Sequence, residues 1–112
     1  MADRTQGTDL PMGLKDSLES ITKLKGMKGL RVWKYDVQCA LEFHNLSDLI
    51  DSSLPWPQQT DSTYENWWRL SRKVSMWLGL QIEAEVKERL VLEPSKDSYA
   101  DKTYKLILKL IK

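Results

Sequence analysis

The spacing of the apolar residues between positions 64 and 90 constrains the fold more than any other feature of this sequence. Apolar side chains recur there at intervals of mostly three or four residues, and they continue past Gly79. The members of this series are Tyr64, Trp67, Leu70, Val74, Trp77, Leu78, Ile82, Val86 and Leu90. Such spacing is typical of a helix with one side against a core. Glycine inside a helix costs about 1 kcal/mol relative to alanine, so Gly79 predicts either a kink or a junction between two helices.

Two further segments follow the same period and predict amphipathic helices. The first spans residues 30–44, and the second runs from about Asp97 to the end of the chain. Their apolar residues are Leu30, Trp33, Val37, Ala40 and Leu41 in the first, and Ala100, Tyr104, Ile107, Leu108 and Ile111 in the second. The last segment is apolar on more than one side, so we expect it to pack into a groove or to have continued into a part that is missing.

Shorter signals occupy the intervals between these helices. Residues 17–24 fit either a short helix or an extended arm, and residues 46–50 predict a brief helix. Ser62 is followed three residues later by Glu65. This is the spacing of a capping box, in which each of the two side chains binds a free backbone N–H at the start of a helix. We therefore expect the long helix to begin at this pair.

These patterns predict an all-α protein, a compact bundle of four to five helices. No segment shows the strict alternation and two-residue turn signal of a β-hairpin. A chain of 112 residues supports a single domain with a modest core. Residues 1–16 are mostly polar and predict a flexible segment. Residues 17–112 then form the helical domain.

The tryptophans are the second informative feature, since there are five of them. Each can bury roughly 150–250 Å². Trp56 stands between two prolines, and Trp68 lies about 100° around the helix from Trp67. We therefore name Trp56 and Trp68 as candidate interface rings, with burial by a loop as the alternative for Trp68. The candidate core comprises Trp33, Val37, Leu41, Trp67, Leu70, Val74, Trp77, Tyr104 and Ile107.

Residues that carry chemistry are scarce. Cys39 is the single cysteine and His44 the single histidine, which excludes an internal disulfide framework and a zinc site of several thiolates. We expect Cys39 to be a small buried group, and His44 to lie on the surface or at a helix end. The sequence contains no recognisable catalytic constellation, phosphate-binding glycine loop, metal motif or cofactor motif. We predict a protein without enzymatic activity, metal or cofactor.

Charge and hydropathy exclude further classes. Seventeen basic and sixteen acidic residues give a net charge of +1, which disfavours nucleic-acid binding by bulk charge. No apolar run approaches the roughly 20 residues that a membrane span needs, and the start of the chain lacks the order of a secretory signal. With a single cysteine, these features predict a cytoplasmic protein.

One local basic stretch leaves RNA contact open as an alternative. Its members are Lys23, Lys25, Lys28, Arg31 and Lys34. Basic side chains among aromatic rings are typical of single-stranded nucleic-acid surfaces. However, Trp33 falls on the apolar face of its helix and is expected to be buried, which favours a solvated basic rim over an RNA site.

Several segments, taken in order, carry a resemblance to a known family. They are Ile21–Gly26, Leu30–Trp33, Leu46–Asp51, a loop with Pro55 and Pro57, Trp67–Leu78 and Ala100–Ile107, where Tyr104 stands in place of a tryptophan. From about Ser17 onward the sequence resembles the start of the Gag polypeptide of copia-type LTR retrotransposons.

The resemblance implies a capsid-like N-terminal helical domain that associates with itself into a shell. It also implies truncation before a second capsid half. One cysteine and one histidine cannot form the zinc knuckle of that family, so its RNA-packaging role is not carried over. Two alternatives stay open: a host-retained remnant that acts as an adaptor or as an inhibitor co-assembling with full-length Gag, and an unrelated helical module that binds a partner protein.

Overall fold

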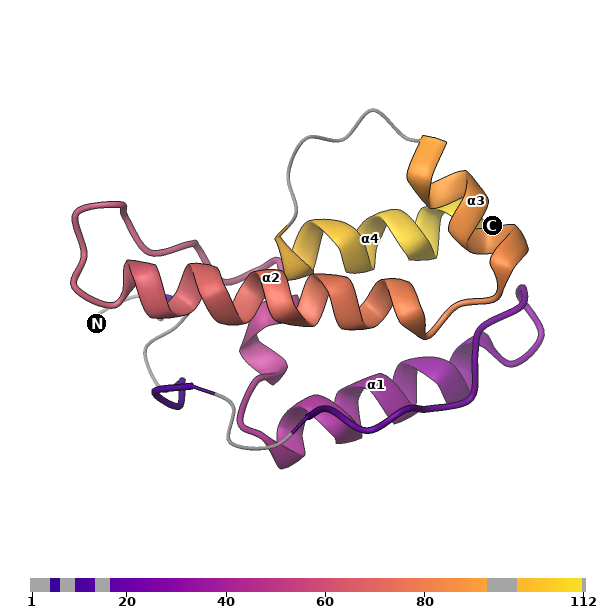
Figure 1. The fold of residues 1–112 in the computed structure, drawn as a ribbon, viewed down its shortest axis with the longest axis horizontal. Coiled ribbons are helices and arrows are strands. Elements are labelled where there is room, and N and C mark those ends of the chain that lie inside the picture. Colours follow the sequence, from indigo (N-terminus) through magenta and orange to yellow (C-terminus); the bar gives the residue numbers. More distant parts are fainter. Residues whose placement is uncertain (1–4, 7–9, 14–16, 93–98, 112) are drawn as a thin grey trace.

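The computed structural model confirms the all-α prediction. It describes residues 5–6, 10–13, 17–92 and 99–111. The helices are α1 (Leu30–Phe43), the 3-10 helix η1 (Ser47–Ile50), α2 (Tyr64–Leu80), α3 (Ala84–Leu92) and α4 (Ala100–Ile111) (Figure 1). Within the described ranges there is no β-strand, only an isolated parallel bridge between Leu24 and Ile82.

The last helix packs against three other elements, which explains why its sequence is apolar on more than one side. α4 contacts α2, α3 and η1, and it lies along α2 in Figure 1. Ile107 is fully buried, and Leu108 and Ile111 pack against the core from partly buried positions. The groove into which this helix was expected to pack is therefore formed by α2, α3 and η1. The predicted helix start near Asp97 lies outside the described residues.

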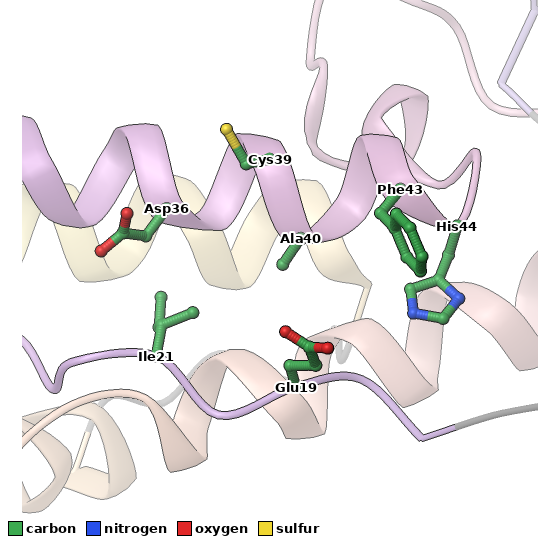
Figure 2. A pocket seen from close by; sticks show the side chains of 7 residues that line it. All are labelled: Glu19, Ile21, Asp36, Cys39, Ala40, Phe43 and His44. Atoms are coloured by element: carbon green, nitrogen blue, oxygen red, sulfur yellow. The ribbon is translucent and has the colours of Figure 1, made fainter.

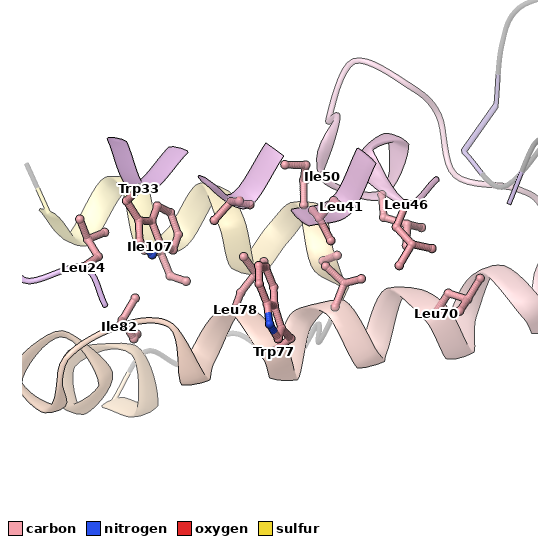
Figure 3. Close-up of a cluster of buried hydrophobic side chains, with 14 of the residues drawn as sticks. Leu24, Trp33, Leu41, Leu46, Ile50, Leu70, Trp77, Leu78, Ile82 and Ile107 are labelled. Atoms are coloured by element: carbon pink, nitrogen blue, oxygen red, sulfur yellow. The ribbon is translucent and has the colours of Figure 1, made fainter. Parts of the chain in front are cut away.

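Most candidate core residues lie in one buried cluster (Figure 3). The buried members are Trp33, Val37, Leu41, Trp67, Leu70, Val74, Trp77 and Ile107. Tyr104 is only partly buried and lies at the edge of this cluster. Its ring stacks on that of Trp33, with 6.1 Å between the ring centroids. Partial burial also raises the pKa of the Tyr104 phenol.

The long apolar series forms two helices. α2 ends at Leu80 and α3 begins at Ala84, so Gly79 lies in the last turn of α2 and the junction follows it. Residues 17–24 form an extended arm instead of a helix, because Leu24 pairs with this junction. The Leu24 N–H donates to the Gln81 carbonyl at 2.9 Å, and the Glu83 N–H donates to the Leu24 carbonyl at 2.9 Å.

The end of α1 is closed by a turn that needs a left-handed residue. Asn45 adopts φ 59°, a conformation that asparagine tolerates better than most residues. The Leu46 N–H donates to the Leu41 carbonyl at 2.7 Å, and the Asn45 N–H donates to the Glu42 carbonyl at 3.0 Å. This is a Schellman motif, and its usual apolar contact is present because Leu41 and Leu46 are both buried.

The predicted capping box at the start of α2 is wrong. Thr63 is the residue before the helix, and no side chain caps it there. Asp61 organises the preceding turn instead: its Oδ1 accepts from the Thr63 N–H and from the Thr63 hydroxyl, both at 2.8 Å. These hydrogen bonds lower the pKa of the Asp61 carboxyl. Ser62 and Glu65 fail as a pair because the helix begins two residues after Ser62.

Asp61→Ala is therefore expected to lower the urea midpoint of unfolding, whereas Ser62→Ala, the matched control, leaves it nearly unchanged. Because the pKa of Asp61 is lowered in the folded state, its contribution is present at neutral pH and is lost as the pH falls through that pKa. Urea titrations at neutral and at acid pH, followed by circular dichroism, measure this difference. A larger loss for Ser62→Ala would reinstate the capping box.

Gln6, which lies within the segment expected to be flexible, has a buried and hydrogen-bonded side chain. It is 1% exposed, and its side-chain NH₂ donates to the carbonyls of Asp51 at 3.0 Å and Leu54 at 3.2 Å. The Trp67 Nε1–H donates to the Gln6 side-chain oxygen at 2.9 Å. Gln6 thus supplies polar partners inside the fold, and at this position the chain is anchored to it.

Candidate functional site

Helix α1 has a second apolar face, opposite the face that packs in the core. Val32, Cys39 and Phe43 lie within about 40° of one another around the helix, and Tyr35 lies beside them. All four side chains are exposed: Val32 is 62% exposed, Tyr35 68% and Phe43 81%, and Cys39 is also exposed. Below, these four residues are called the outer face of α1.

The outer face is a continuous feature and not a scatter of single residues. From Val32 to Phe43 it extends about 16 Å along the helix axis. Isolated exposed apolar residues are normal on proteins, whereas a contiguous apolar patch marks an interaction site.

The expectation that Cys39 is buried is wrong, because it lies two residues from both Val37 and Leu41 and so points about 200° away from each. A hydrogen bond with Cys39 raises the pKa of the Tyr35 phenol.

The extended arm runs beside α1 in the opposite direction. A pocket of about 350 Å³ separates them near the end of α1, lined by Glu19, Ile21, Asp36, Cys39, Ala40, Phe43 and His44 (Figure 2). A second pocket of about 240 Å³ lies near the start of α1, where Lys23, Lys25, Lys28 and Val32 contribute to its wall. Asp36 lines both pockets. The two hollows therefore adjoin along one side of the helix.

The arm is held by polar contacts to α2 and to the junction after it. The Ile21 N–H donates to the Gln81 side-chain oxygen at 2.9 Å, and the Trp77 Nε1–H donates to the Glu19 carbonyl at 3.0 Å. The Trp33 Nε1–H donates to the Gln81 carbonyl at 2.9 Å. One wall of the two pockets is thus fixed to the body of the fold.

Charge divides this surface into two ends. The start of α1 and the adjoining arm present five exposed basic side chains, Lys23, Lys25, Lys28, Arg31 and Lys34. The other end presents acidic side chains from Glu19 and Glu42, and Asp36 lies midway along the helix. The first turn of α1 contains no acidic residue and its last turn no basic one. This order is the reverse of the one that the dipole of an isolated helix favours.

The basic stretch agrees with its prediction at Trp33 but differs from it at Tyr35. Trp33 is 2% exposed, in agreement with its position on the core face. Tyr35, however, is exposed and lies on the same helix as Arg31 and Lys34. An aromatic ring therefore accompanies the basic side chains at the surface. His44 is the residue directly after α1, partly buried, with its imidazole edge-on to Phe43 at 5.2 Å.

The two candidate interface tryptophans are engaged within the chain and only partly exposed. The Trp56 Nε1–H donates to the Asp101 carboxylate at 2.9 Å, and its ring packs edge-on against Tyr99 at 4.6 Å. The Trp68 ring lies under the Arg72 guanidinium at 5.2 Å. Both rings pack against the core cluster. The outer face of α1 is far more accessible than either tryptophan.

The outer face has a signal of its own in the sequence. Val32, Cys39 and Phe43 are spaced by seven and four residues, which is a helical period of its own. It is interleaved with the stronger core series, so a search for one apolar stripe does not separate the two.

Comparison with family models, curated proteins and solved structures finds no match. Within the described residues, no group of three or more histidine, cysteine or acidic side chains is arranged to hold a metal ion. Of the helices in this part of the chain, none combines the length and apolar character needed to cross a bilayer.

Proposed function

We propose that this chain is a structural protein that associates with further copies of itself, the role implied by its resemblance to the capsid-like region of copia-type Gag. The observation that carries the proposal is the outer face of α1. It is apolar, exposed and contiguous, while the same helix is firmly packed on its other side through Trp33, Val37 and Leu41. A rigid helix with a free apolar face is suited to helix-helix contact.

Repeated small contacts are sufficient for such a role. An assembly with many copies multiplies modest interfaces through symmetry, so each contact need not be strong alone. Interfaces are enriched in tyrosine and phenylalanine at their centres, and Tyr35 and Phe43 supply these rings here. The outer face therefore provides the exposed apolar side chains and the aromatic residue types of a protein-protein contact.

The pocket between the arm and α1 favours a second candidate, a module that binds a segment of another protein. Its apolar wall from Ile21 and Ala40 and its acidic rim from Glu19 and Asp36 suit a short segment with apolar and basic side chains. A chain that stays monomeric at every concentration would favour this candidate over self-association.

The double substitution Val32→Ser/Phe43→Ser is expected to weaken self-association at least tenfold, because it removes most of the apolar area of the outer face. Sedimentation velocity over a wide concentration range measures the weight-average mass. Met76→Ser/Leu80→Ser is the matched control, since those two α2 side chains are each 60% exposed but lie elsewhere. Far-UV circular dichroism should be unchanged in both variants. A wild-type chain that shows no increase in mass with concentration contradicts the proposal.

A further inference from the structure

We infer that two copies of this chain pair through their α1 helices in antiparallel orientation, about a two-fold axis that passes close to Tyr35 and Cys39. This inference rests on the proposed self-association and specifies its geometry. It is argued from the distribution of charge on either side of the outer face, since the apolar residues alone would accept either orientation.

A two-fold axis perpendicular to the helices brings the start of one α1 beside the end of the other. Residues on one flank of the outer face then meet the same flank of the second copy in reverse order. Arg31 and Glu42 lie on one such flank, near opposite ends of the helix. In an antiparallel pair, each Arg31 lies opposite the Glu42 of the other copy, and this contact occurs twice.

The other flank of the outer face also carries basic residues at one end and an acidic residue at the other, so it can pair with itself in an antiparallel dimer. There the arm adds Lys23 and Lys25 beside the start of α1, and Glu19 beside its end. The antiparallel arrangement places this basic end against the acidic end of the second copy. A parallel arrangement would place basic ends together and acidic ends together, which costs energy on both flanks.

The reversed charge order of α1 has a physical role in this arrangement. Basic residues at the start of a helix and acidic residues at its end are unfavourable beside the helix's own dipole. An antiparallel neighbour supplies the opposite end of a second dipole together with charges of the opposite sign. The charges that an isolated α1 holds unfavourably thus become favourable between two copies.

A polyanion such as RNA is the competing occupant. It would bind the basic end, but Glu19, Asp36 and Glu42 would repel it along the rest of the same surface. A second copy accounts for both ends, whereas RNA accounts for one. The charge pattern therefore favours pairing between copies.

Charge reversal tests the orientation. Arg31→Glu and Glu42→Arg are each expected to raise the dimer dissociation constant about tenfold, because each creates two like-charge contacts in an antiparallel pair. The double variant Arg31→Glu/Glu42→Arg is expected to return close to the wild-type constant. An equimolar mixture of the two single variants should form a heterodimer more tightly than either alone. Sedimentation velocity at low salt measures the wild-type constant and the four others.

The possible results distinguish the antiparallel geometry from the proposed self-association on which it rests. If Val32→Ser/Phe43→Ser weakens association while both charge reversals leave it unchanged, the outer face is an interface but the antiparallel geometry is refuted. The antiparallel geometry is also refuted if the dissociation constant of the double variant does not return close to that of the wild type. If the wild-type chain is monomeric and Arg31→Glu abolishes salt-sensitive binding to single-stranded RNA, the basic end is a nucleic-acid surface and both proposals fall.

Discussion

Replacing Trp67 with alanine is expected to lower the free energy of unfolding by about 3–5 kcal/mol, the usual cost of removing a large buried ring. Trp67 has no exposed surface. Its ring contacts those of Trp56, Tyr64 and Tyr99, with centroids 5.9, 5.5 and 5.1 Å away. The substitution also removes the donor to the buried Gln6 side chain.

The neighbouring ring is the matched control. Trp68→Ala is expected to cost about 1 kcal/mol, because Trp68 is partly exposed and its described polar neighbour is the exposed Arg72. Urea unfolding followed by circular dichroism compares the two variants. Similar losses for both would mean that Trp68 belongs to the core to the same degree as Trp67, against the difference in burial.

Gln81→Ala is expected to cost about 2 kcal/mol and to loosen the arm selectively. Gln81 is 3% exposed. Its side-chain oxygen accepts from the Ile21 N–H, and its side-chain NH₂ donates to the Trp77 carbonyl at 3.2 Å. Alanine removes the side-chain partners of the partly buried Ile21 N–H and of the buried Trp77 carbonyl, which costs about 1–3 kcal/mol.

Hydrogen exchange distinguishes this local effect from general destabilisation. The amide of Ile21 should exchange much faster in Gln81→Ala than in the wild type. Amides in the middle of α2 should change their exchange rate only as far as the global free energy of unfolding changes. Gln58→Ala, at an exposed loop position, is the control and should change neither. Unaltered protection of Ile21 in Gln81→Ala would show that the arm is held without this side chain.

Helix positions and core residues were predictable because they depend on local periodicity. Trp33, Val37 and Leu41 repeat at four-residue intervals, and burial of one face follows from that spacing. The junction after Gly79 was also indicated, since glycine disfavours a helix interior. These features require only information within one or two helical turns.

The polar anchors could not be predicted, because their partners are distant in sequence. Gln6 binds Trp67 across 61 residues, and Gln81 binds Ile21 across 60. A buried glutamine has no periodic signature, and a glutamine in a polar segment predicts exposure. The exposure of Cys39 differs from expectation for another reason: its residue type favours burial, but its angle on α1 directs it outward.

The same long-range anchors determine when the early part of the chain can take up its position. Gln6 and Ile21 leave the ribosome before the residues that they bind, which are synthesised about 60 positions later. Closing loops of this length carries an entropic cost that is repaid only once α2 exists. The arm therefore docks after the helical body has formed, and until then the core face of α1 lies open on a growing chain.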